Sequence, residues 1–195
     1  MKKIILTLLM GLCTVSKADI YDFNLGVGLM NEAVGRYQTD VNGDKSLFNN
    51  KLALEAGASF PLDDDQAWRL HGDLGLLWPS GEVSYITRNV FYMTANLGYS
   101  LTKEFEWRLG GGFYFTRISG EGGTVPIQNG DSTTNFPIPE EASISRNVTL
   151  NTSFNYEFYQ DVSVRTEAFV FNPLNSRNRT FNVALTLRYH FGEVL

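Results

Sequence analysis

Cysteine, histidine, proline and clusters of positive charge are all scarce in this sequence. Its 195 residues contain one cysteine, two histidines and six prolines. A single cysteine excludes a disulfide framework. Lysine and arginine together number 16 against 21 acidic residues, and no basic cluster stands out. This charge balance excludes nucleic acid as a partner.

The chain also lacks long apolar runs, although it is rich in apolar and aromatic residues. Aromatic residues make up 13% of the sequence and hydrophobic residues 43%, so the chain can bury a core and extended disorder is excluded. Beyond residue 18, no apolar stretch is long enough for a transmembrane helix. If the protein enters a membrane, it does so as a β-barrel.

The first 18 residues have the pattern of a secretory signal peptide. Lys2 and Lys3 precede an apolar stretch at 4–12, and Ser16-Lys-Ala18 forms a small-x-small cleavage site. Leu12 stands where a lipoprotein signal needs Gly or Ala before the cysteine, so Cys13 is not read as a lipid anchor. We therefore predict an exported protein with a signal peptide at 1–18 and one β-barrel domain at 19–195.

From residue 21 onward the hydrophobic pattern has period two, which predicts strands. The connections between the predicted strands alternate between short and long. The short ones are 61–66, 100–104 and 159–161. This alternation is typical of an eight-stranded antiparallel up-and-down transmembrane β-barrel. The eight predicted strands are 21–31, 50–60, 67–78, 87–99, 105–117, 145–158, 162–172 and 179–191.

The longest connection, 118–144, is rich in Gly, Ser, Thr, Asn and Pro. It is interpreted as an exposed, mobile loop and not as a second domain. It contains four acids and no base, and Phe136 lies beside Pro137 and Pro139. The loop is therefore the candidate contact site for an extracellular ligand.

One face of the predicted strands is apolar and carries no charged residue. Its aromatic side chains concentrate at the strand ends, as in the two aromatic belts of a membrane barrel. The predicted belt residues are Phe60, Trp68, Tyr99, Trp107, Phe158 and Phe191 at the short-turn end, and Trp78, Phe91, Phe115 and Phe181 at the long-loop end.

The opposite face is small and polar, with six bases and six acids. A soluble barrel with the apolar face inside is the alternative, but an eight-stranded interior has no room for about fifteen aromatic residues. The polar face is therefore predicted to line the lumen, where charges must pair. The predicted lumenal network is Glu55, Arg69, His71, Asp73, Arg88, Glu106, Arg108, Glu157, Arg165, Glu167 and Arg188.

The mature chain resembles the small eight-stranded outer-membrane barrels of the OmpA/OmpX type. The resemblance is carried by the signal peptide, the strand–turn alternation and the last strand, 181–191, with aromatics at Tyr189 and Phe191. It implies insertion into outer-membrane lipid by the barrel-assembly machinery, which would read that last strand. Thr186 replaces a common Gly, and four residues follow Phe191, where such chains usually end.

The sequence offers no catalytic constellation, so an enzyme is not predicted. His71 is placed in the lumenal network, and Asp63-Asp-Asp65 is interpreted as a solvated turn and not as a metal site. No cofactor or metal is predicted. The favoured hypothesis is a structural or surface-interaction protein with a plugged lumen; a narrow channel and, less favoured, a lipid-modifying enzyme are the alternatives.

Overall fold

The computed structural model describes residues 22–32, 34, 38–39, 45–46, 50–78, 86–129 and 132–193. The predicted signal peptide at 1–18 lies outside these ranges. Within them the chain forms strands and turns, and no helix is present. In the described part of the chain, therefore, no helix is long and apolar enough to cross a membrane.

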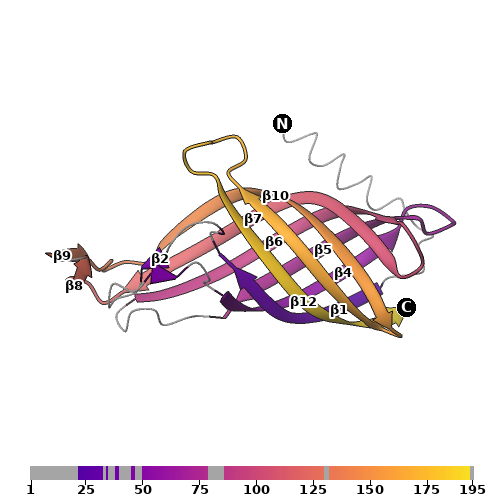
Figure 1. Cartoon of the computed structure of the whole chain (residues 1–195), viewed down its shortest axis with the longest axis horizontal. Coiled ribbons are helices and arrows are strands. Elements are labelled where there is room, and N and C mark those ends of the chain that lie inside the picture. The colour runs from indigo at the N-terminus through magenta and orange to yellow at the C-terminus, as the bar shows by residue number, and fades with distance from the viewer. Residues whose placement is uncertain are drawn as a thin grey trace.

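Eight antiparallel strands close into a barrel in which each strand pairs with its chain neighbours and the first pairs with the last (Figure 1). Closure is made by residues 22–31 against 183–193. The barrel strands are β1 (Asp22–Asn31), β4 (Asn50–Pro61), β5 (Trp68–Leu77), β6 (Ile86–Ser100), β7 (Phe105–Gly120), β10 (Ser143–Tyr159), β11 (Val162–Phe171) and β12 (Thr180–Glu193).

All eight predicted strands are present, and most boundaries agree within about two residues. The predicted fold class is confirmed. The largest differences are at the long-loop end, where β7 continues to Gly120 and β10 begins at Ser143. The two strands pair with each other up to Ile118 and Ser143, and β6 pairs with β7 up to Ile86 and Gly120.

The connection 118–144, interpreted from its sequence as an exposed, mobile loop, contains regular structure that the sequence did not predict. Beyond the paired ends of β7 and β10, the chain forms a hairpin of β8 (Thr124–Asn129) and β9 (Ser132–Pro137). Asn129 pairs with Ser132, and the two residues between them in the sequence are Gly and Asp, a pair typical of two-residue hairpin loops. Ile138 is buried at the base of this hairpin and donates a backbone hydrogen bond to Gly123.

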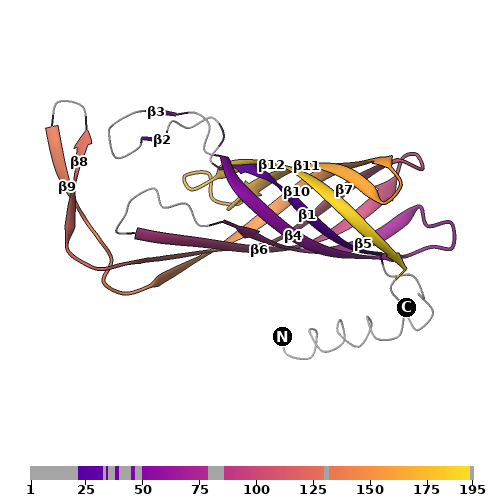
Figure 2. The same ribbon diagram turned by 90° about the horizontal axis from the view of Figure 1, so that it is seen from below.

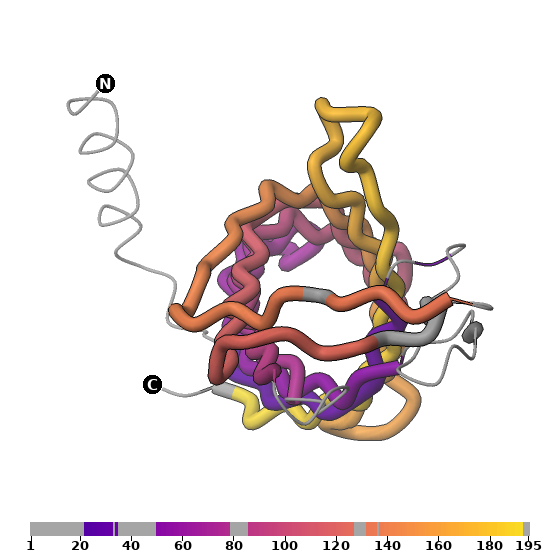
Figure 3. The backbone as a smooth tube through the Cα atoms, turned by 90° about the vertical axis from the view of Figure 1, so that its left-hand side faces the viewer, coloured from indigo at the N-terminus to yellow at the C-terminus, as the bar shows by residue number. Residues whose placement is uncertain are grey.

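Strands β6, β7 and β10 extend well past the rest of the barrel wall on one side. They have 15, 16 and 17 residues, whereas β5 and β11 have 10 each. The β8–β9 hairpin sits at the far end of this extension and turns across the barrel axis (Figures 2 and 3). A short ladder, β2 (Gln38–Thr39) with β3 (Lys45–Ser46), lies in the first long connection.

Burial alternates along each strand and identifies which face is inside. Leu25, Leu74, Leu109, Leu150 and Leu185 point outward, and each is between 45% and 55% exposed. Arg165 and Arg188, from the polar face, are about 1% exposed. The barrel is therefore apolar outside and polar at its centre, the reverse of a water-soluble barrel.

Candidate functional site

The centre of the lumen is an ionic layer of two arginines and three carboxylates. Arg165 contacts Glu55 at 2.7 Å, Asp73 at 2.9 Å and Glu167 at 2.9 Å, measured between guanidinium nitrogens and carboxylate oxygens. Arg188 contacts Glu55 and Asp73, both at 2.8 Å. Each guanidinium thus bridges at least two carboxylates, which compensates the loss of water around all five charges.

Amide side chains connect this layer to the remaining walls. Asn24 accepts a hydrogen bond from Arg188 at 2.7 Å, and Asn151 donates to Glu167 at 2.5 Å and to Asn96 at 2.6 Å. Together with these amides, the ionic layer draws on β1, β4, β5, β6, β10, β11 and β12. The network therefore ties walls on opposite sides of the barrel to one another.

A second charged group lies between the ionic layer and the short-turn end. Arg108 pairs with Glu106, and His71 Nε2 lies 3.2 Å from a Glu106 oxygen. His71 and Arg108 are 2% and 3% exposed. His71 is therefore a buried lumenal side chain in contact with Glu106, and not part of a site open to substrate.

The lumen toward the long-loop end is filled by an aromatic layer, which is not part of the predicted lumenal network. Tyr92 stacks on Tyr114 with ring centroids 6.1 Å apart, and Phe171 meets Tyr114 edge-on at 4.6 Å. Phe169 packs against Tyr92 at 5.6 Å. Tyr92 also donates a hydrogen bond to Glu55, which joins the aromatic layer to the ionic layer. The other buried residues of this cluster are Met30, Ala53, Leu77, Val90 and Ala184.

On the long-loop side of the aromatic layer, Glu32 and Arg88 form a two-point ion pair with oxygen–nitrogen distances of 2.5 and 2.7 Å. Tyr114 donates a further hydrogen bond to Glu32 at 2.5 Å. Burial alone would raise the pKa of Glu32, but the hydrogen bonds and positive charge of Arg88, with the Tyr114 bond, hold that pKa below its ordinary value. Glu32 lies just past the end of β1, outside the predicted strand and the predicted lumenal network.

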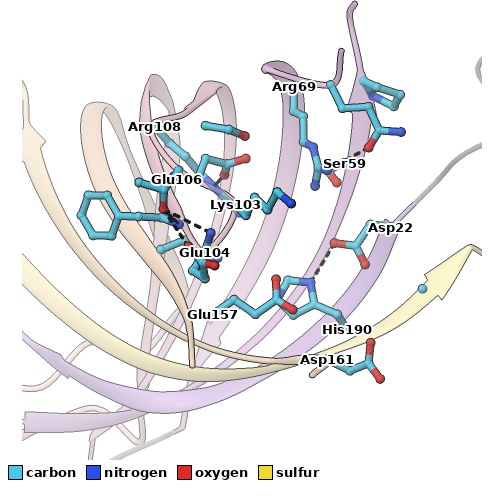
Figure 4. A pocket seen from close by; sticks show the side chains of 17 residues that line it. Asp22, Ser59, Arg69, Lys103, Glu104, Glu106, Arg108, Glu157, Asp161 and His190 are labelled. Atoms are coloured by element: carbon cyan, nitrogen blue, oxygen red, sulfur yellow. Dashed lines mark hydrogen bonds and ion pairs between the residues drawn. The ribbon is translucent and has the colours of Figure 1, made fainter. Parts of the chain in front are cut away.

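The short-turn end of the lumen opens into a polar cavity of about 250 Å³ (Figure 4). Its walls come from the three short turns and the ends of β1 and β12. Glu106 and Arg108 also line it, so the inner charged group borders this cavity. The remaining charged or titratable residues that line it are Asp22, Arg69, Lys103, Glu104, Glu157, Asp161 and His190.

Beside this cavity, Ser163, His190 and Asp22 are connected in the order found in serine hydrolases. Ser163 Oγ lies 2.8 Å from His190 Nε2, and His190 Nδ1 lies 2.7 Å from Asp22. However, Ser163 is 0% exposed, and its Oγ also donates to Asn155 at 2.9 Å. A substrate carbonyl cannot reach this oxygen as it stands. The chain of bonds instead joins β1, β12 and β11 across the seam where the barrel closes.

The structure brings together eight of the eleven residues in the predicted lumenal network. Arg69, Arg88 and Glu157 are the exceptions. Arg69 donates to Gln66 at the short-turn mouth, and Arg88 pairs with Glu32 at the other end. Glu157 lines the cavity at the short-turn mouth and is exposed there, apart from the buried charges. Alternation gives the side on which a residue lies but not its depth along the barrel axis.

The ten predicted belt residues all lie on the outer face. Seven of them are at least 37% exposed, and Phe60, Phe91 and Phe115 are partly covered by neighbours. Rings from adjacent strands meet within each group: Trp68 lies 4.7 Å from Tyr99, and Phe91 lies 6.0 Å from Phe115. The outer face thus carries aromatic groups at both ends of an aliphatic band.

The acidic turn at 63–65 closes the β4–β5 connection. The Asp63 side chain accepts a hydrogen bond from the backbone of Trp68 at 3.1 Å, and its carbonyl accepts one from Gln66 at 3.1 Å. Among the residues that the structure describes, no group of three His, Cys, Asp or Glu side chains could hold a metal ion.

No family model matches the chain, and no curated protein sequence matches it. Among solved structures, Ail, the attachment invasion locus protein of Yersinia pestis, is 10% identical with a TM-score of 0.51, over 88% of this chain and 98% of Ail. Neisserial surface protein A is 9% identical with a TM-score of 0.48, over 87% and 95% of the two chains. The N-terminal barrel of Pseudomonas aeruginosa OprF is 9% identical with a TM-score of 0.45, over 86% and 97%.

At these identities the likeness is one of fold. The chain has the fold of the small eight-stranded outer-membrane barrels, as the sequence resemblance predicted.

Proposed function

We propose that this protein is an outer-membrane β-barrel whose role is structural and surface-interacting, with the β8–β9 hairpin as its contact element. The observation that carries the proposal is the extension of β6, β7 and β10, which holds the hairpin beyond the barrel rim (Figure 2). A paired, three-stranded support keeps a loop away from the membrane at a defined distance, which a purely structural barrel does not need.

The outer face supports a membrane location. Outward side chains in the middle of the barrel are aliphatic, and aromatic groups flank them at both ends. We further propose that 1–18 directs export and that the barrel-assembly machinery reads the last strand at Tyr189 and Phe191. The long loops would then face the outside of the cell, and the short turns the periplasm.

The filled lumen favours display over conduction. Two layers of different chemistry cross it: the aromatic layer around Tyr92 and Tyr114, and the ionic layer around Arg165 and Arg188. A narrow channel would require both layers to move. An enzyme would require a reactive group that a substrate can reach, and the buried Ser163 does not provide one.

Deletion of 122–140 tests the contact role. Ile118 and Ser143 remain paired at the new junction, so the barrel is expected to fold and to migrate faster on a gel unboiled than boiled. Binding of expressing cells to immobilised extracellular-matrix proteins is expected to fall relative to wild type.

The matched control for this experiment replaces residues 175–176 of the β11–β12 loop, which lies outside the extension, with Gly-Gly. Equal binding by wild type, control and deletion would overturn the contact role and leave a structural barrel. A deletion that fails to fold, while the control folds, would show that the hairpin is part of the barrel's own stability.

A further inference from the structure

Four exposed arginines gather at the long-loop end of one side of the barrel, and we call them the arginine rim: Arg117, Arg146, Arg177 and Arg179. Arg117 and Arg146 lie on β7 and β10, where Arg146 pairs across the ladder with Phe115 and Arg117 with Ile144. Arg177 and Arg179 lie in the loop that connects β11 to β12.

Hydrogen bonds hold that loop beside the strand arginines. The Asn172 amide side chain donates to Asn147 at 3.0 Å, and the Asn172 backbone donates to Val148 at 2.9 Å. Arg179 donates to the carbonyl of Pro173 at 2.6 Å, which braces the loop internally. The rim is therefore continuous across β7, β10 and the β11–β12 connection.

The arginine rim lies at the same level along the barrel as the aromatic belt at the long-loop end. The Arg146 guanidinium stacks over Phe115 at 5.5 Å from the ring centroid, and Arg179 is two residues from the belt residue Phe181. In a membrane barrel this belt marks the headgroup region. Guanidinium groups at that level face lipid headgroups, not the hydrocarbon core.

The sequence around the rim contains no negative charge. The stretches 87–91, 113–119, 143–148 and 172–181 contain no Asp or Glu, and the nearest acids along the chain, Glu121 and Glu141, lie further out at the base of the hairpin. The short-turn end differs, with acids at Asp63, Asp64, Asp65, Glu104 and Asp161. At the short-turn end the bases thus lie among acids, whereas the four rim arginines lie in stretches without acids.

Exposed apolar side chains accompany the arginines. Leu174, at the tip of the loop, is 100% exposed, and Ile144 on β10 is 69% exposed. The loop stands out sideways from the barrel wall (Figures 1 and 3), so its tip projects over the surrounding surface and not over the lumen. Basic groups beside exposed apolar groups are the composition of a segment that lies in a lipid interface.

We propose that the arginine rim binds the phosphate groups of anionic lipid in the leaflet at the long-loop end, with Leu174 inserted among the lipids. Arginine suits this role because its planar guanidinium binds phosphate through two parallel hydrogen bonds. The inference rests on the proposed membrane location. Beyond that location, it specifies anionic lipid as the class that is bound and the four arginines as the residues that select it.

The test measures lipid selectivity with protein refolded in phosphocholine vesicles. Spin-labelled phosphatidic acid and spin-labelled phosphatidylcholine are added separately, and the motionally restricted fraction of each gives their relative association constants. Wild type is expected to prefer phosphatidic acid. Each arginine removed is expected to lower that preference about fivefold, which corresponds to about 1 kcal/mol per basic residue near an anionic surface.

Two variants divide the rim, so that a folding defect in one leaves the other informative. R117Q/R146Q removes the strand arginines, and R177Q/R179Q removes the loop arginines. Lys103→Gln is the matched control, because Lys103 is an exposed base at the opposite end of the barrel. Each rim variant is expected to lower the preference for phosphatidic acid about 25-fold, fivefold for each of the two arginines removed, and the control is expected to leave it unchanged. Leu174→Ser should weaken binding of both lipids equally.

The outcomes separate this inference from the proposed membrane location. If wild type restricts neither lipid and shows no heat-dependent gel mobility, the membrane location is wrong and the rim proposal falls with it. If wild type inserts but has no preference for phosphatidic acid, or if folded rim variants keep the preference, the rim proposal alone is overturned.

Discussion

At the scale of single residues, Glu55 is the carboxylate on which the lumenal network depends most. One of its oxygens contacts Arg165 at 2.7 Å and Arg188 at 2.8 Å, and the other accepts the Tyr92 hydroxyl. Glu55→Gln removes a charge shared by two buried guanidinium groups. We expect the free energy of unfolding to fall by about 3–5 kcal/mol, measured by urea titration of protein refolded in vesicles.

Glu157→Gln is the control for this change. Both residues were predicted to lie in the lumenal network, but Glu157 is exposed at the cavity mouth. Its replacement should change the free energy of unfolding by no more than about 0.5 kcal/mol. Equal effects of the two substitutions would contradict the depth that the structure assigns to them.

The ion pair of Glu32 with Arg88 predicts that the free energy of unfolding depends on pH in the acid range. Its pKa is lowered in the folded protein from an ordinary value of 4.5, so the unfolded chain takes up its proton first as the pH falls. The stability from this pair is therefore complete above about pH 4.5 and is lost as the pH falls through the folded pKa. Glu32→Gln should flatten the acid side of the unfolding curve, and Glu141→Gln, at an exposed site, should not.

At the scale of strands, the contact between β5 and β6 depends on a glycine that an aromatic ring covers. Gly75 pairs with Tyr92, and a Cβ at Gly75 would lie 2.0 Å from the tyrosine ring. Gly75→Ala must displace the ring that donates to Glu55 and packs on Phe169. We expect a loss of about 1–3 kcal/mol in the free energy of unfolding.

Gly72→Ala is the matched control on the same strand, since a Cβ there meets nothing within 4 Å. A much smaller loss is expected, and the near-ultraviolet circular dichroism of the folded protein should not change. If Gly72→Ala proves as costly as Gly75→Ala, the effect comes from strand glycines in general and not from the covered ring.

The positions of the strands were predictable because apolar and polar residues alternate over nine or more positions in each strand. The aromatic layer was not predicted, although the sequence carries a signal for it. In Phe91-Tyr92, Phe113-Tyr-Phe115 and Phe169-Val-Phe171, apolar residues occupy consecutive positions, so some of them must face inward. Only the closed barrel shows that these inward rings meet one another.

The partners within the ionic layer could not be read from the sequence. Alternation correctly assigned Arg165 and Glu55 to the inner face, but they are 110 positions apart. Which residues meet depends on strand tilt and on the stagger that closes the barrel. The same limit explains Arg88, whose partner Glu32 lies in a connection and not on a predicted strand.

At the scale of the whole molecule, the filled lumen predicts that the protein does not conduct ions steadily. The aromatic layer and the ionic layer lie at different depths of the lumen, and we propose that each of them closes the passage. In planar bilayers, wild type should show no sustained porin-like current. Deletion of 122–140 should not change this, because the hairpin is not part of either layer. A steady, large conductance from wild type would overturn the filled lumen and favour the channel alternative.

The long sequence separations inside the ionic layer have a consequence for the order of folding. Arg188 bonds to Asn24 across 164 positions and to Glu55 across 133, so these bonds require the first and last strands to have met. They cannot assist the early hairpins, whose contacts are local. Interactions that form after the rate-limiting step leave the folding rate almost unchanged and slow unfolding. The ionic layer would thus act as a latch, giving the finished barrel a long lifetime without making its assembly faster.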